Sequence, residues 1–409
     1  MRKPLIRLIL ALCCIPIAPN FTCAAANAQN ASSKNAQARE SQNQFTSEKF
    51  AFSLFAAIAK KQAGENLLIS PFSAYTALSM VLLGSADATR SQIADVLGIA
   101  SDKINEVNSH NQRNMQRLVS SKAIQLDIAN AIFADSQTNF QKPFLDQCHS
   151  AYDAEIKSID FKRADTVNTI NQWCSDKTHG KIAKLLSELS PQARMVLLNA
   201  VYFKGAWQHK FDKAFTTDDK FTSSSGKALP VKMMSQTQDF EYLKEKSFTM
   251  VSLPYVDRDL RMFILLPNKG VDIDKLQSEL NQTNWRKWKN AAQTVDVHLS
   301  MPRFRIEYSA ELKDVLQSMG MSDAFSVARA NFSPMCKEPT FIGSVIHKAY
   351  MDVTEQGTEA AAATAVTMLA QSAMRPEPVE EFRVDHPFFI ILAEQKSEEI
   401  LFFAKVLKP

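Results

Sequence analysis

The sequence predicts a mixed α+β fold in one large domain, and three observations support this. The 409 residues are 45% hydrophobic and 22% charged, which is typical of a soluble globular protein with a large core. Apolar residues near the start repeat at helical spacing, whereas later segments are short runs rich in β-branched and aromatic residues. We find no internal repeat, and no linker rich in Pro and Gly before residue 370.

The helices and strands follow in order. Phe50, Leu54 and Ile58 predict a first amphipathic helix. Ser70 and Pro71 suit the cap and first turn of a second helix, which would end at Gly84. Further helices are expected at Thr166–His179 and Ala310–Met319. Strands are expected at 196–203, 251–253, 262–266, 295–299, 388–392 and 400–406.

The N-terminal region resembles a secretory leader. Three basic residues precede an apolar run of about eleven residues, which is too short for the roughly 20 that span a bilayer. Ala26-Asn27-Ala28 offers a cleavage site, so residues 1–28 are predicted to be removed. Residues 29–44 are polar and predicted to be a disordered lead-in. We therefore expect an exported protein, secreted or periplasmic, with no membrane span in its mature form.

Charge and motif content exclude several classes of function. Without the leader, 44 basic and 43 acidic side chains remain, a net charge of +1, which argues against nucleic-acid binding. The cluster Trp285–Lys289 could bind a polyanion, but a solvated face with two half-buried tryptophans is the favoured interpretation. The common hydrolase, zinc and nucleotide-binding motifs are absent. We expect no enzyme activity, no metal and no cofactor.

Three cysteines remain once the leader is removed, namely Cys148, Cys174 and Cys336. Because the count is odd, at least one is a free thiol. We interpret them mainly as buried small hydrophobes, and the sequence leaves one disulfide open.

The segment from Glu355 to Thr367 is the most unusual in the chain. Its four consecutive alanines favour a helix on propensity alone. Gly357 and Thr358 stand where such a helix should already have formed, and three β-branched residues follow within Thr364–Thr367. The extended sequence Arg375–Pro378 also differs from a capped helix end.

This segment resembles the reactive-centre hinge of inhibitory serpins, and further motifs match the family in the expected order. They are Asn66–Gly84, the NAVYFKGAW sequence at 199–207, Leu253–Tyr255, Leu265–Pro267, His347–Ala349 and His386–Phe389. The resemblance covers residues 45–409. It implies a single α+β domain with three β-sheets, eight or nine helices and an exposed reactive-centre loop at about 357–379. It also implies a monomer whose partner is a serine protease, with a cysteine protease as the alternative.

The resemblance gives the hinge residues a physical role, because the cleaved loop of this family inserts into the main sheet as a new strand. The hinge residues are Glu355, Gly357, Thr358, Glu359, Ala360, Ala361, Ala362, Ala363 and Thr364. Since a strand alternates faces, Thr358 and Ala360 would point into the core and Glu359 outward. Small side chains would ease insertion, and the attached protease would be trapped as an acyl-enzyme.

The position of the cleaved bond is predicted less sharply. Counting seventeen residues from Glu355 gives Gln371–Ser372, which we prefer because the inserted strand must fit a sheet of fixed length. Counting back from His386 gives a bond between Ala373 and Arg375. The protease class therefore stays open.

Other residues match single positions of the serpin pattern, and the resemblance implies a role for each. Ser70, Ser73, Asn199 and His347 match the shutter, a polar cluster where the main sheet opens. Arg303 would pair with Glu355 at the breach, the top of that sheet, where lysine is more common. Trp207 is expected in the core. The sequence leaves two alternatives open: a non-inhibitory serpin acting as a carrier or chaperone-like binder, and a hydrolase with an unrecognised triad.

Overall fold

The computed structural model describes residues 47–121, 124–190, 193–358 and 379–409. The predicted leader (1–28) and lead-in (29–44) lie outside the described residues. Within the described part of the chain, no helix is long and apolar enough to cross a membrane.

Nine α-helices occur in the described residues. They are α2 (Glu48–Lys61), α3 (Pro71–Leu83), α4 (Asp87–Leu97), α5 (Ile104–Val119), α6 (Lys142–Tyr152), α7 (Thr166–Lys177), α8 (Ile273–Glu279), α9 (Gln282–Ala291) and α10 (Lys313–Ser318). The first two expected helices are confirmed, and the side chain of Ser70 caps α3 by accepting from the backbone N–H of Ser73. Pro71 occupies the first turn, where its missing N–H costs nothing.

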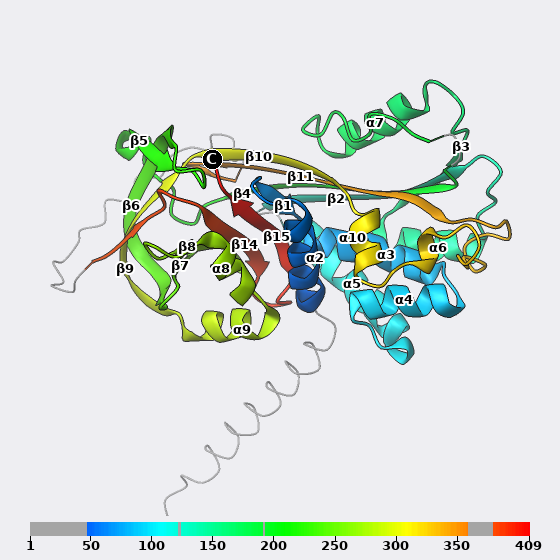
Figure 1. Cartoon of the computed structure of the whole chain (residues 1–409), viewed down its shortest axis with the longest axis horizontal. Coiled ribbons are helices and arrows are strands. Elements are labelled where there is room, and N and C mark those ends of the chain that lie inside the picture. The colour runs from blue at the N-terminus through cyan, green and yellow to red at the C-terminus, as the bar shows by residue number, and fades with distance from the viewer. Residues whose placement is uncertain (1–46, 122–123, 191–192, 359–378) are drawn as a thin grey trace, which may run out of the picture. The chain divides into compact units, whose positions relative to one another are not determined.

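The six-stranded sheet contains the segment singled out by the sequence. Its order is β10 (Phe304–Glu311), β11 (Ile342–Thr354), β12 (Gly357–Thr358), β4 (Met195–Ala206), β2 (Ile124–Asp135) and β3 (Glu155–Ile159). Figure 1 shows α7 on one face of this sheet and α3 on the other. The face under α7 has its own apolar cluster, which includes Ile170 and Cys174 of that helix.

The larger sheet has nine strands. Eight follow in the order β1 (Leu67–Ile69), β15 (Ile400–Val406), β14 (Phe388–Glu394), β8 (Leu260–Pro267), β7 (Phe248–Pro254), β6 (Ala228–Lys244), β9 (Gln293–Pro302) and β13 (Glu380–Arg383). The ninth, β5 (Thr217–Thr222), pairs with the start of β6.

Two expectations about these elements need correction. The α+β class is confirmed, but the described strands form two hydrogen-bonded sheets rather than three. This is because the 17-residue β6 pairs with β5 at one end and β7 at the other and so joins their strands into one sheet. The helix expected from Ala310 begins only at Lys313, since Ala310 and Glu311 pair with β11 as the end of β10.

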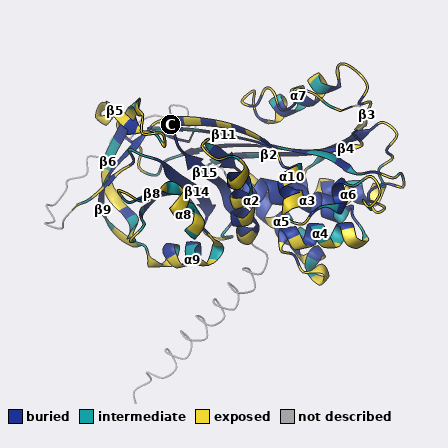
Figure 2. Cartoon of the chain, in the orientation of Figure 1, coloured by how far each residue is buried: buried dark blue, intermediate teal, exposed yellow. Residues whose placement is uncertain are grey.

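The core lies largely between the two sheets, where α3 is buried along nearly its whole length (Figure 2). Trp285 and Trp288 are 0% and 4% exposed, so the tryptophans of the basic cluster belong to the core more fully than expected. The cations of α9 beside them, Arg286 and Lys289, bind the buried carboxylate of Glu48. All three cysteines are buried free thiols.

Candidate functional site

The candidate site lies where β11 and β4 separate at one end of the six-stranded sheet. The two strands pair directly in parallel from Ile342 and Met195 as far as Tyr350 and Tyr202. Beyond that point the two-residue β12 lies between them and pairs with both. The six-stranded sheet is therefore closed along most of the boundary between β11 and β4, and these two strands are already separated at one end.

Gly357 fits this position because it has no side chain. Its φ of +142° is a conformation that other residues rarely adopt. A Cβ atom added there would lie 2.0 Å from the carbonyl oxygen of Gly205 on β4. The backbone of β12 can therefore approach β4 this closely only with glycine.

Thr358 is completely buried, as strand alternation predicted. Its hydroxyl lies 2.7 Å from the hydroxyl of Tyr255, so one of the two groups donates a hydrogen bond to the other. Burial raises the pKa of Tyr255 well above its ordinary value, which keeps the phenol protonated. A small polar side chain suits this position, and a large or charged one would not fit.

Trp207 holds the turn that leads into β12. Its indole Nε1 donates to the carbonyl of Thr354 at 2.9 Å, and its backbone N–H donates to the carbonyl of Gln356 at 3.1 Å. The ring stacks on Tyr255 with a centroid separation of 4.6 Å. Trp207 is 1% exposed, so the expectation of a core residue is confirmed.

The predicted pair at the top of the sheet is present. Arg303 Nε lies 3.7 Å from a carboxylate oxygen of Glu355, whose side chain is 4% exposed. The hydroxyl of Thr216 donates to the other carboxylate oxygen at 3.0 Å. The backbone N–H of Phe211 also donates to the Glu355 carbonyl, which fixes the residue before the turn.

The structure brings all four predicted shutter residues together beneath the same boundary. His347 on β11 and Asn199 on β4 are direct partners in the strand pairing, and His347 Nδ1 lies 2.6 Å from Asn199 Oδ1. Asn199 Nδ2 donates to the carbonyl of Ser73 and to its hydroxyl. The backbone N–H of Ser70 donates to His347 Nε2 at 3.0 Å. The side chains thus join β11 and β4 to the start of α3.

These contacts require a neutral His347 with its proton on Nδ1. Nε2 accepts from the Ser70 N–H, so only Nδ1 can donate to Asn199. Complete burial lowers the pKa of His347 to about 4, which matches this assignment. If Nε2 of His347 were also protonated, two donors, this N–H and the backbone N–H of Ser70, would face each other.

Two members of the polar cluster were missed from the sequence. Asn130 on β2 accepts from Asn199 Nδ2 at 2.6 Å and donates to the hydroxyl of Thr76 at 3.2 Å. Both residues are buried, and Asn130 faces Asn199 across the strand pair. An asparagine within an apolar strand was the signal available, because a buried amide needs partners.

The remaining hinge residues, Glu359, Ala360, Ala361, Ala362, Ala363 and Thr364, lie outside the described residues, as does the predicted bond Gln371–Ser372. Across the described segments, no group of three His, Cys, Asp or Glu side chains could hold a metal ion.

Comparison with known proteins decides the family. The model for "Serpin (serine protease inhibitor)" matches residues 45–409. The chain belongs to the serpin family. This serpin is 35% identical over 370 residues to Serpin B6 of Macaca fascicularis, covering 88% of this chain and 97% of the relative. It is 36% identical over 374 residues to a leukocyte elastase inhibitor of Xenopus laevis, with the same shares covered.

Solved serpin structures have the same fold. The thermophilic serpin tengpin in its native state superposes with a TM-score of 0.82 at 29% identity, over 90% of this chain and 94% of tengpin. Human thyroxine-binding globulin complexed with its ligand gives 0.83 at 27% identity, over 90% and 98% of the two chains. The family thus includes relatives named as protease inhibitors and one named as a ligand carrier.

Proposed function

We propose that this serpin is an exported suicide inhibitor of proteases that traps its target by inserting the cleaved reactive loop into the six-stranded sheet. The main support for the proposal is the position of β12 between β11 and β4. Gly357 and Thr358 already lie between β11 and β4, directly before the segment that would insert. The chain is thus poised for insertion, with its first two residues in place.

Insertion requires β11 and β4 to separate along their shared boundary. Each inserted residue must replace a direct contact between these strands, and the contact between His347 and Asn199 lies on the path. The inserting residues predicted after Thr358 are mainly alanine and threonine. Their small side chains would keep the barrier low.

The chemistry of trapping belongs to the protease. Its nucleophile attacks the carbonyl of Gln371, the peptide bond to Ser372 breaks, and the protease remains attached to the loop as an acyl-enzyme. Insertion of about sixteen residues at about 3.3 Å each would carry it about 50 Å. The serpin is consumed in this reaction and is not an enzyme.

The target is proposed to be a serine protease, with a cysteine protease as the alternative. Arg375 is followed by Pro376, which makes that bond a poor substrate for a trypsin-like protease. Leu369 and Ala370 would suit a protease that recognises an apolar residue before the cut. A leukocyte elastase inhibitor among the relatives supports testing elastase first. No nucleic acid, membrane, metal or cofactor is required, and a monomer suffices.

Export is proposed from the leader pattern of residues 1–28. Secretion fits a mature body with a net charge of +1 and no predicted span. The N-terminus of the exported protein, read by mass spectrometry, should begin at Gln29. A protein retained in the cell with Met1 present would contradict this part of the proposal.

The trapping test uses the mature protein and a panel of serine and cysteine proteases. We expect a serpin–protease band that survives denaturation, and a released C-terminal peptide whose mass identifies the cleaved bond. A protease with its nucleophile chemically blocked is the control and should give no adduct. Clean cleavage by every protease without an adduct would instead indicate a non-inhibitory member, such as a carrier.

A further inference from the structure

The side chain of Glu399, in the turn between β14 and β15, joins three elements that are far apart in the sequence. It is 0% exposed. Its Oε2 accepts hydrogen bonds from the backbone N–H and from the hydroxyl of Ser47, the residue directly before α2. Its Oε1 accepts from Nδ2 of Asn114, on α5, at 3.4 Å. One buried carboxyl therefore connects the last two strands of the chain to the start of α2 and to α5.

A buried carboxylate needs a counter-ion, and the cations of α9 near Glu399 are bound to other carboxylates. Glu48, the first residue of α2, is buried and pairs with Arg286 at 2.6 Å and with Lys289 at 3.2 Å. Glu398 shares Arg286 at 3.3 Å. Over the described residues, no lysine or arginine pairs with Glu399, and its one ion-pair contact is with a histidine. If it were ionised, Glu399 would therefore be an uncompensated charge near a second buried carboxylate.

His110, the histidine beside Glu399, lies on α5 and does not supply the missing charge. Its Nε2 lies 3.9 Å from Oε1 of Glu399. The same nitrogen lies 2.8 Å from Nδ2 of Asn114, and because an amide NH₂ group only donates, Nε2 accepts and carries no proton. Burial lowers the pKa of His110, and the charges of two arginines on α5 lower it further. The histidine is therefore neutral, and one of these arginines, Arg117, is itself paired with Glu394.

These surroundings keep a proton on Glu399. Burial, together with the charges of Glu48 and Glu394, raises the pKa of Glu399 from 4.5 to about 8. The hydrogen bonds from Ser47 lower this pKa, but the effect of burial is larger. From α3, the phenol of Tyr75 interacts electrostatically with Glu399, and burial raises the pKa of this phenol and keeps it uncharged. The carboxyl of Glu399 is thus neutral at pH 7 and becomes a carboxylate only at higher pH.

We propose that Glu399 is a proton-operated latch on the start of α2. With its proton bound, the carboxyl stays buried and holds Ser47 and the first turn of α2 against α5. Without the proton it is a buried carboxylate that lacks a counter-ion, so its exposure to water becomes favoured and the contact to Ser47 opens. Among the described residues, none of its hydrogen-bond partners belongs to β12 or to the polar cluster beneath the sheet, so the latch is separate from protease trapping.

Hydrogen exchange at the backbone amide of Ala51 tests the latch, because this N–H donates to the carbonyl of Ser47 at 2.8 Å. Once the contact to Ser47 opens, Glu399 reaches water and takes its ordinary pKa of 4.5. The opening equilibrium should therefore rise about tenfold for each pH unit between pH 4.5 and about pH 8. In the mature protein we expect a rise of about 100-fold between pH 5.5 and 7.5, measured as the exchange rate of Ala51 divided by its intrinsic rate at each pH.

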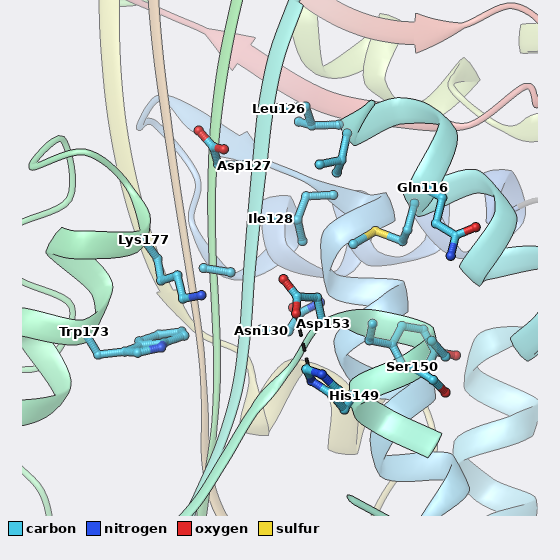
Figure 3. Close-up of a pocket in the computed structure, with 15 residues that line it drawn as sticks. Gln116, Leu126, Asp127, Ile128, Asn130, His149, Ser150, Asp153, Trp173 and Lys177 are labelled. Atoms are coloured by element: carbon cyan, nitrogen blue, oxygen red, sulfur yellow. Dashed lines mark ion pairs between the residues drawn. The ribbon is translucent and has the colours of Figure 1, made fainter. Parts of the chain in front are cut away.

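Two variants separate the latch from other effects of pH. Glu399→Gln keeps the size of the side chain but cannot ionise, so it should make the opening at Ala51 independent of pH over the same range. Asp153→Asn is the matched control. Asp153 lies 4.0 Å from His149 and is 86% exposed, and this pair is the dashed line of Figure 3. The control also removes a carboxylate beside a histidine, but from solvent, so the pH dependence at Ala51 should stay as in the native protein.

Infrared spectroscopy detects the proton on Glu399 directly in the native protein, because the C=O stretch of a neutral carboxyl is distinct from the bands of a carboxylate. We expect this band at pH 6.5, a weaker band at pH 9, and no band in Glu399→Gln. Thermal melts establish that each variant is folded. The proposal is overturned if the native protein lacks the band at pH 6.5, or if the opening at Ala51 depends on pH equally in Glu399→Gln and in the native protein.

Discussion

Thr358→Arg should convert the protein from an inhibitor into a substrate. The Thr358 side chain is 0% exposed and lies between β11 and β4 with its hydroxyl on Tyr255. The partner of Thr358 is the uncharged phenol of Tyr255, which cannot neutralise a guanidinium, so we expect an arginine here to leave the sheet in the native state. Completing the insertion would then require burial of an unpaired guanidinium, which costs several kcal/mol.

The size of the effect follows from the rate law. A cost of about 4 kcal/mol on the insertion barrier slows insertion by about a thousandfold. Deacylation is a property of the protease and keeps its rate, so the acyl-enzyme would hydrolyse before the loop inserts. The assay is the stoichiometry of inhibition, meaning the number of serpin molecules consumed per protease trapped, together with the adduct on a denaturing gel.

Gln356→Arg is the matched control, because it adds the same charge at a half-buried position in the preceding turn. It should keep most of the trapping activity. Thr358→Val keeps the shape without the hydroxyl and should give an intermediate result. If Thr358→Arg trapped protease with the stoichiometry of the native protein, the assignment of Thr358 to the inserting strand would be wrong.

Three further predictions concern stability. The pKa of His347 is about 4 in the folded protein and 6.5 in the unfolded chain, so the unfolded chain takes up the proton first as the pH falls. The contribution of His347 to the free energy of unfolding should therefore be complete above about pH 6.5 and should fall by about 3 kcal/mol towards pH 4. Urea unfolding measured across this pH range should show the decrease in the native protein and not in His347→Gln. Gly357→Ala would place a Cβ 2.0 Å from the Gly205 oxygen and should speed hydrogen exchange at residues 353–358; unchanged exchange would contradict the tight approach. Arg303→Ala should cost about 0.5–1 kcal/mol in denaturant unfolding, because Arg303 is half exposed while its partner Glu355 is buried, and Arg303→Lys should recover most of the loss.

Local patterns predicted many of the elements well. The strand expected at 400–406 is β15, and Ser70 with Pro71 marks the start of α3. These elements are fixed by signals within a few residues of each other: alternation, caps and fixed φ angles. Where signals conflict, as at Ala310, the pairing of β10 with β11 extends the strand at the expense of the helix.

The candidate site was predictable only in part. Motif order placed Ser70, Ser73, Asn199 and His347 in one cluster, and the structure brings them together. Asn130 and Thr76 were missed, because nothing near them in sequence shows which strand faces Asn199. Their part in the cluster depends on strand register, which joins residues far apart in the chain.

The sequence by itself determined the serpin family, the α+β class and the residue types of the hinge, because ordered motifs and local propensities are properties of the chain. Only the tertiary structure decided that β12 already lies between β11 and β4 and that Tyr255 satisfies Thr358. It alone showed that β6 joins the remaining strands into one sheet. These features depend on long-range register and on which side chains find partners, and neither is encoded within any one segment.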